Sequence, residues 1–122
     1  MFGFIERCDE CSVNLGDLLH HNEVIENLDL SSNKLGFHCC LAIAQGLQIN
    51  RAITTLNVAN NLLANAGEAT LEHFWIALCM NTSLRVLDIS SNQLGPTWIK
   101  RICHALSRNN TITMINLQKT YM

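Results

Sequence analysis

The chain has 122 residues, a length that favours a single domain. Apolar residues make up 48% and charged residues 15%, and this balance argues for a packed core and against disorder. The formal charge is -2, and the sequence has neither a basic block nor a long apolar run, so nucleic acid and membrane are not expected partners.

The first predicted element is a helix from about Cys11 to His21. Its apolar residues are Val13, Leu15, Leu18 and Leu19. Asn22 follows this helix, at a position that recurs three more times along the chain. We therefore expect residues 1–24 to form a partial repeat that lacks a strand of its own.

Three segments then share one pattern, in which apolar and polar residues alternate and an Asn follows at a fixed distance. They are Ile25–Gly36, Ile53–Ala64 and Leu84–Gly95. A fourth begins at Ile112 and departs from the pattern at Thr120, where Asn is expected. The starts at residues 25, 53, 84 and 112 are spaced by 28, 31 and 28. The alternation predicts a short strand in each, with one face buried.

Helices are predicted between the strands, because apolar residues recur there at intervals of three and four. The three apolar faces are Cys40, Ile43, Ala44 and Leu47; Leu71, Phe74, Trp75 and Leu78; and Ile99, Ile102, Cys103 and Leu106. Trp98 lies off this face, and we expect it either to be half exposed or to pack against the next helix. Because Asn tolerates the left-handed conformation, Asn50, Asn81 and Asn109 are predicted to end the helices in that conformation. The longer middle spacing predicts a bulge around Leu62 to Gly67.

The repeated pattern resembles the leucine-rich repeat, L-x-x-L-x-L-x-x-N-x-L, over about residues 11–122. The period near 28 is similar to that of the ribonuclease-inhibitor-like subfamily, which includes the repeats of NOD-like receptors and Ran GTPase-activating proteins. The resemblance implies an α/β leucine-rich repeat solenoid, a short right-handed β-α arc with parallel strands on its concave face and helices on its convex face. One domain over residues 1–122 is expected, with repeats at 25–52, 53–83 and 84–111 and a truncated repeat at 112–122.

Residues that point outward from the strands form the candidate surface for a protein partner. They are Asn27, Asp29, Thr55, Asn57, Arg85, Asp88, Met114 and Asn116. The alternative is that these polar residues simply solvate an open sheet face. Asn33, Asn61 and Asn92 are expected to be structural, because a buried amide can bond backbone groups of neighbouring turns.

No nucleophile motif, phosphate-binding loop or recurrent histidine pair is visible, so neither catalysis nor a cofactor is expected. Cys8 and Cys11 form a C-x-x-C pair that would bind zinc only with two further ligands, for which His20 and His21 are the nearest candidates. We expect no metal site. The start of the chain lacks the apolar run of a signal peptide, so the six cysteines are expected to be reduced in the cytoplasm.

Both ends of the predicted array lack a polar cap, so we expect neighbouring chains or missing repeats to cover them. The sequence thus favours a non-enzymatic interaction or scaffold module, as a small subunit or fragment of a larger complex, such as a cytoskeletal or ciliary one. The alternative is a regulator of an enzyme, such as a GTPase-activating protein, although no residue can be carried over for that role. Fold alone does not fix function.

Overall fold

The structure of the chain is a computed structural model that describes residues 9–63 and 67–118, with only the backbone described for residues 9–12. Helices and strands alternate along it. In chain order they are α1 (Asp9–His21), β1 (Asn27–Asp29), α2 (Phe37–Ile49), β2 (Thr55–Asn57), α3 (Glu68–Met80), β3 (Val86–Asp88), α4 (Pro96–Arg108) and β4 (Met114–Asn116).

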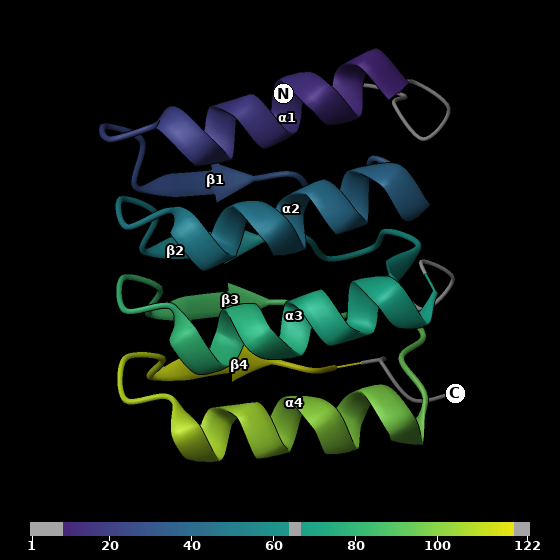
Figure 1. The fold of residues 1–122 in the computed structure, drawn as a ribbon. Helices are drawn as coiled ribbons and strands as arrows, with labels where there is room; N and C mark the ends of the chain where they lie inside the picture. The colour runs from purple at the N-terminus through teal and green to yellow at the C-terminus, as the bar shows by residue number, and fades with distance from the viewer. Residues whose placement is uncertain (1–8, 64–66, 119–122) are drawn as a thin grey trace.

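The four strands form one parallel sheet in the order β1-β2-β3-β4. The helices form a second layer that covers one face of this sheet (Figure 1). Equivalent residues of successive repeats are paired, as Leu28 is with Leu56, Leu56 with Leu87 and Leu87 with Ile115. The predicted α/β arc of stacked strand-helix units is therefore confirmed.

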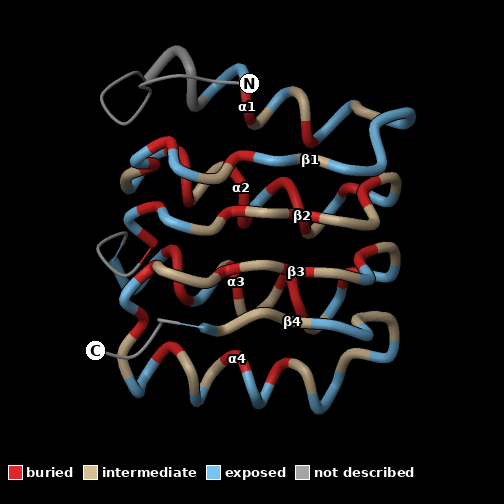
Figure 2. Tube along the Cα trace, turned by 180° about the vertical axis from the view of Figure 1, so that it is seen from behind, coloured by how far each residue is buried: buried red, intermediate tan, exposed pale blue. Residues whose placement is uncertain are grey.

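The core lies between the strand layer and the helix layer, and equivalent positions are buried in successive repeats (Figure 2). Leu56 and Leu87 in the two central strands are fully buried, whereas Leu28 and Ile115 in the two outer strands are only half-buried. Each repeat therefore depends on its neighbours to cover its apolar side chains, as expected of a solenoid.

The buried face of the helices is wider than the sequence predicted. Trp98 is buried and packs edge-on against Phe74 of α3, with the ring centroids 6.0 Å apart. It thus contacts the preceding helix, and the expectation of half exposure or of contact with the next helix was wrong. Cys39 and Thr70, at the same position of α2 and α3, are also buried. The apolar helix face predicted from the sequence did not include the position that Cys39, Thr70 and Trp98 share.

Two residues assigned to apolar helix faces are exposed. Cys103 lies on the side of α4 that would face a following helix, and the described residues contain no helix there. Val13 in α1 is 61% exposed. Because burial on these sides requires a neighbouring element, helical periodicity alone cannot decide it.

The helices do not end in the left-handed conformation that was predicted for their terminal Asn residues. Asn50, Asn81 and Asn109 have φ values of -63°, -66° and -95° and lie in the extended region. Left-handed residues occur instead where strands turn toward helices, as at Ser32, Asn60 and Ser91. The predicted bulge falls largely on residues 64–66, which lie outside the described residues.

Candidate protein-binding surface

The eight predicted surface residues all lie in or beside the strands, on the sheet face that the helices do not cover. The residues within the strands alternate with the inward leucines and so point to the opposite side, and Arg85, which precedes β3, is exposed beside them. The register forms two columns across the sheet, one of Asn27, Thr55, Val86 and Met114 and one of Asp29, Asn57, Asp88 and Asn116. We call the residues of these two columns, together with Glu26 and Arg85, the strand face. Figure 2 views the molecule from behind Figure 1, and its strands are mainly half-buried or exposed.

The second column has a structural role that sequence reasoning missed. The Asp29 carboxylate accepts hydrogen bonds from the Ser31 backbone N–H at 2.9 Å and from its hydroxyl at 2.6 Å. Asp88 accepts the same pair from Ser90, at 3.0 and 2.6 Å. These bonds end each strand by satisfying the next free N–H group. They also fix the direction of the carboxylates before any partner arrives.

Both asparagines of this column make the same turn. The Asn57 side-chain oxygen accepts from the Ala59 N–H at 2.9 Å, and that of Asn116 accepts from the Gln118 N–H at 3.0 Å. The signal in the sequence was the Asp or Asn that recurs at the last position of each strand. The column is thus a row of acceptors at the strand spacing of about 4.8 Å.

The strand face has an acidic balance. The Ser31 hydroxyl and backbone N–H lower the pKa of Asp29, so that this carboxylate is charged at neutral pH. Glu26 and Asp88 add two more carboxylates, and Arg85 adds one exposed cation. Met114, which is 62% exposed, gives the face an apolar end beside β4.

A ladder of buried amides lies behind the strand exits. The Asn61 side-chain oxygen accepts from the backbone N–H groups of Asn33 and Leu35, both at 3.0 Å. Its amide nitrogen donates to the carbonyls of Leu30 and Val58, also at 3.0 Å. Asn92 bonds the N–H groups of Asn61 and Leu63 in the same way. Each amide thereby joins two repeats.

A second ladder, not anticipated from the sequence, lies at the ends of the helices. The Asn50 amide donates to the carbonyl of Leu19 at 2.8 Å, and its oxygen accepts from the Ile53 N–H at 2.8 Å. Asn81 and Asn109 repeat these bonds one and two repeats later. The sequence signal for this ladder was an Asn that recurs three residues before the start of each strand segment. The two ladders hold the loops on both sides of the strand face.

A polar cluster joins α3 and α4 on the helix side. The Trp75 ring stacks on His104 with centroids 5.7 Å apart, and its N–H lies 3.2 Å from His104 Nδ1. The Arg101 guanidinium lies 5.5 Å from the Trp75 ring centroid and 3.2 Å from the Glu72 carboxylate. These contacts link the two helices on their outer side.

Neither a metal centre nor a membrane span is found in the part of the chain that the structure describes. No group of three or more His, Cys, Asp and Glu side chains lies together among the residues searched. No described helix is both long and apolar enough to cross a membrane. The zinc alternative at Cys8 and Cys11 falls on side chains outside the described residues.

Comparison with known proteins points to one class. The family model for the Leucine Rich Repeat matches residues 83–105. The chain is 30% identical over 104 residues to human "NACHT, LRR and PYD domains-containing protein 13", covering 85% of this chain and 9% of that protein. It is 30% identical over 94 residues to mouse "NACHT, LRR and PYD domains-containing protein 12", covering 77% of this chain and 9% of that protein. This chain therefore spans about a tenth of the length of these curated relatives.

A solved structure has the same fold. The structure titled "Leiomodin-1 Actin-Binding Site 2 (ABS2)" superposes with a TM-score of 0.78 at 23% sequence identity, covering 94% of this chain and 66% of that one. The stacked strand-helix units thus define a leucine-rich repeat protein. Its repeats are of the NOD-like receptor type.

Proposed function

We propose that this chain is a non-enzymatic protein-binding module and that its strand face holds a segment of a partner protein. The observation that carries the proposal is the row of acceptors from Asp29 to Asn116, which Asx turns hold in fixed directions. Fixed side chains lose little entropy on binding. The solved relative named as an actin-binding site supports a binding role for this fold.

The charge of the strand face favours a basic partner segment. Glu26, Asp29 and Asp88 outnumber Arg85, and the backbone N–H groups around Asp29 and Asp88 keep their carboxylates oriented. Exposed ion pairs add little affinity one by one. They do select against acidic partners and raise the association rate.

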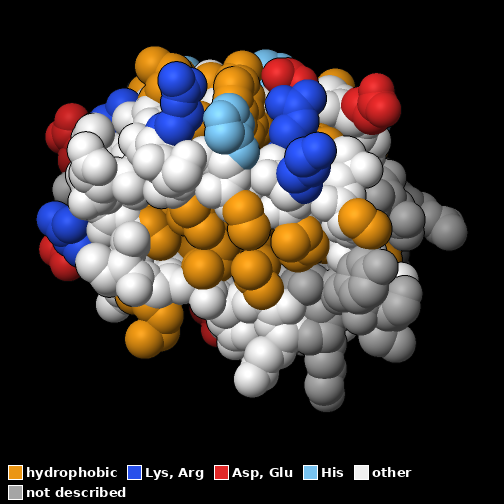
Figure 3. All heavy atoms as spheres, turned by 90° about the horizontal axis from the view of Figure 1, so that it is seen from below, with side chains coloured by type: hydrophobic (Ala, Val, Ile, Leu, Met, Phe, Trp, Pro, Cys, Tyr) orange, Lys and Arg blue, Asp and Glu red, His pale blue; other side chains and the backbone are white. Residues whose placement is uncertain are grey.

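The module is proposed to work inside a larger cytoplasmic assembly, with a cytoskeletal one as the first candidate. Half-buried apolar side chains from α4 and the last strand segment gather at one end of the array, where Figure 3 shows an apolar patch with Lys, Arg and His side chains along one side. They include Ile99, Leu106, Ile112, Ile115 and Leu117. Such a patch is suited to a neighbouring chain or a further repeat.

Purified actin is the first partner to test, by fluorescence anisotropy with the full chain. Glu26→Lys with Met114→Arg changes two exposed strand-face residues that take no part in the Asx turns, and it makes the face more basic, so it is expected to weaken binding of a basic segment at least tenfold. Lys100→Glu on exposed α4 is the matched control and should leave the affinity within about twofold. Equal loss in both variants would contradict the strand-face assignment.

If actin does not bind, the strand face is tested without a named partner. Proximity labelling in cells would compare the chain with the E26K/M114R and K100E variants. Neighbours that disappear only with the strand-face variant support the proposal. An unchanged set of neighbours in all three would rule out this face as the binding surface.

A further inference from the structure

The charge of the chain is divided between the two ends of the array. Seven of its ten acidic residues lie before residue 30, together with one basic residue. No acidic residue follows Asp88, whereas four of the eight basic residues come after it. Residues 1–29 thus carry a formal charge of -6 and residues 89–122 one of +4. Because a solenoid places its repeats in order along one axis, this division gives the array an acidic end and a basic end.

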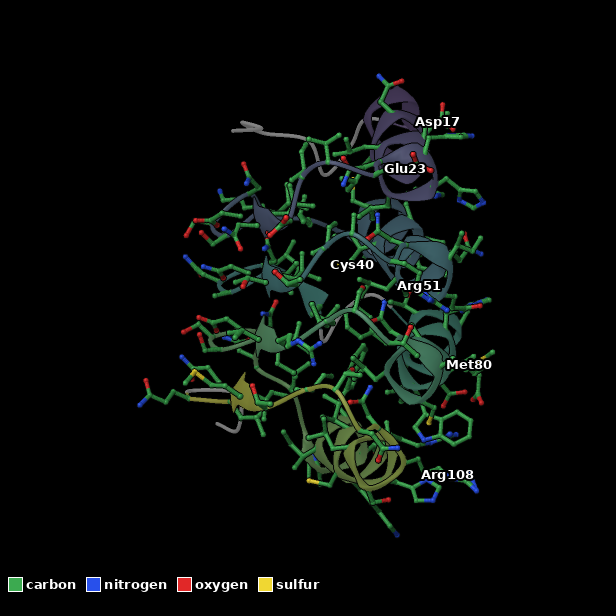
Figure 4. The ribbon with its side chains drawn as sticks, turned by 90° about the vertical axis from the view of Figure 1, so that its left-hand side faces the viewer. Asp17, Glu23, Cys40, Arg51, Met80 and Arg108 are labelled. Atoms are coloured by element: carbon green, nitrogen blue, oxygen red, sulfur yellow. The ribbon has the colours of Figure 1, made fainter. Side chains whose placement is uncertain are left out.

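The exposed charges of the described residues follow this division. Asp17 and Glu23 are exposed at the α1 end of the array, and Arg108 is exposed at the α4 end (Figure 4). At the α4 end, basic side chains border one side of the apolar patch that Figure 3 shows. We call this patch the end patch, and it consists of Ile99, Leu106, Ile112, Ile115 and Leu117.

The α1 end also exposes apolar surface. Ile25 is 40% exposed, whereas Ile53 and Leu84, at the same position of the next two repeats, are buried. Leu28 is half-buried where the central strands have fully buried leucines. Each end of the array therefore combines apolar side chains with charges, and the charges at the two ends have opposite signs.

The two ends also match in geometry. In the described residues a helix follows β1, β2 and β3, but none follows β4. Helix α1 has the same length as α2, α3 and α4, and its buried Leu15 shares its position with the buried Ile43, Phe74 and Ile102. A second copy placed after β4 would thus supply a helix in the register of the repeat.

The backbone bonds between strands could continue into such a copy. The carbonyls of Glu26, Thr54 and Arg85 accept the N–H groups of Thr54, Arg85 and Thr113 in turn, each at 2.8 Å. Thr113 is the last residue of this series and Glu26 is the first. In a stack, the Thr113 carbonyl of one copy would accept the Glu26 N–H of the next, and the parallel sheet would keep its register.

Asn22 is the first member of the ladder at the helix ends, and its amide has a different partner from the rest. The later members donate to a leucine carbonyl one repeat earlier, at 2.8 to 2.9 Å, and they are Asn50, Asn81 and Asn109. The Asn22 amide donates to the Ile25 carbonyl of its own turn, at 2.8 Å. In a stack, the Leu106 carbonyl of the preceding copy would take the place that the earlier leucine has within the array.

The same superposition of repeats brings opposite charges together. Arg51 shares the position of Glu23, and it lines a hollow with His20 and Asn22 of the preceding repeat. In the last repeat, Arg108 lies between the residues that share the positions of His20 and Asn22. Glu23 of a second copy would therefore lie beside Arg108.

Leu18 sets how closely the second copy can approach. It shares the position of Gly46, Ala77 and Ala105, which are buried. An added Cβ at Gly46 would overlap Leu19 of the preceding helix, so this position faces the preceding helix. Because Leu18 is larger and only half-buried, α1 of a second copy would stand further from α4 than from its own α2, with Leu18 packed on the end patch.

We propose that the end patch binds the α1 end of a second copy of this chain, so that copies stack head to tail. Contact between two like ends would bring like charges together, so charge selects the head-to-tail arrangement. Two different surfaces meet in this contact, so it does not close, and copies can add without limit. The proposal rests on the assignment of the end patch to a neighbouring chain under the proposed function, and it is independent of the strand face.

Sedimentation velocity of the full chain, without any partner protein, measures this association. The average mass should rise with concentration beyond that of a dimer, because each added copy offers a new end. A mass that stays at that of the monomer up to millimolar concentration overturns the proposal. A mass that stops at the dimer also overturns it, because it indicates a closed contact.

A charge swap tests the contact itself. Glu23→Lys and Arg108→Glu should each weaken association at least about threefold, because like charges then face each other. An equal mixture of the two variants should associate within about twofold of the unsubstituted chain, because the new lysine of one meets the new glutamate of the other. Glu68→Lys, an exposed change in the middle of the array, is the matched control and should associate as the unsubstituted chain does.

The mixture separates a specific contact from a general effect of charge. Association that is equal in all variants, or a mixture that stays as weak as each variant alone, overturns the proposal. Neither Glu23 nor Arg108 belongs to the strand face, so both variants should bind a strand-face partner as the unsubstituted chain does. Each of the two proposals can therefore fail without the other.

Discussion

Asn61 shows at the scale of one residue how the repeats are held together. Its amide reaches backbone groups of its own repeat and of the preceding one, and the residue is only 7% exposed. Asn is suited to this position because one short side chain both donates and accepts. Shape alone would also allow Asp or Leu, but neither can satisfy all of these groups.

Asn61→Ala is expected to destabilise the chain by about 3 kcal/mol, because it leaves buried N–H and carbonyl groups without partners. Urea unfolding at pH 7 measures the loss. Asn61→Asp, which keeps the shape but cannot donate, should also destabilise strongly. Asn110→Ala, at an exposed residue, is the control and should change stability by less than about 0.5 kcal/mol. Equal small losses for Asn61→Ala and the control would show that the ladder is dispensable.

Cys40 links burial to the pH dependence of stability. The residue lies between the two layers (Figure 4), and its burial, together with the neighbouring Cys39 thiol, raises the pKa of its thiol from 9.0 to about 12. Above pH 9 the unfolded chain loses this proton while the folded chain keeps it. This contribution to stability is therefore present below pH 9 and is lost as the pH rises toward 12.

We expect the unsubstituted chain to lose about 1 kcal/mol more stability than Cys40→Ala between pH 9 and pH 10. Urea unfolding of both proteins at several alkaline pH values gives the difference directly. Cys103→Ala removes an exposed thiol and should keep the steeper pH dependence of the unsubstituted chain. Parallel curves for the chain and Cys40→Ala would contradict the burial of this thiol.

At the scale of elements, two glycines in adjacent helices have opposite roles. Gly46 of α2 lies so close to α1 that an added Cβ would overlap the Cβ of Leu19. The corresponding residues of α3 and α4 are Ala77 and Ala105, which are fully buried. Gly16 of α1 has room for a methyl group. Helix propensity favours Ala over Gly at both positions, so packing decides the sign of each substitution.

Gly46→Ala is expected to destabilise the chain by about 1–3 kcal/mol, because overpacking outweighs the gain in helix propensity. Gly16→Ala should instead stabilise it, by up to about 1 kcal/mol. Thermal unfolding followed by circular dichroism compares the pair. A stabilising Gly46→Ala would mean that α1 can move away from α2 at little cost.

At the scale of the whole molecule, position in the array sets how much each repeat contributes to stability. Leu28, Leu56, Leu87 and Ile115 occupy the same place in four paired strands. The two central residues are fully buried and the two outer ones half-buried. In a solenoid this difference reflects the number of neighbouring repeats.

Leu56→Ala is expected to cost about 3 kcal/mol, and Leu28→Ala roughly half of that, although the chemical change is identical. Urea unfolding measures both, and hydrogen exchange should show faster opening at β1 and β4 than at β2. Equal costs for the two substitutions would indicate that something covers the outer strand in solution.

Much of this architecture could be predicted because it recurs. The alternation at Leu28, Leu56 and Leu87 set the strands and their outward residues, and the spacing of 28, 31 and 28 set the stacking. The role of the outward columns in binding stays a prediction. The Asx turns at Asp29 and Asp88 and the ladder at Asn50 could not be predicted from propensity, because Asp and Asn suit several local conformations.

The sequence by itself determined the kind of repeat, the order of strands and helices and the side of each strand that is buried, since these follow from local periodicity. Only the tertiary structure decided what neighbouring helices do to each position. It buried Trp98 against Phe74 and exposed Cys103 at the end of the array. It also left a hollow on the helix side between α1 and α2. The physical reason is that a helix face becomes core only where another repeat covers it.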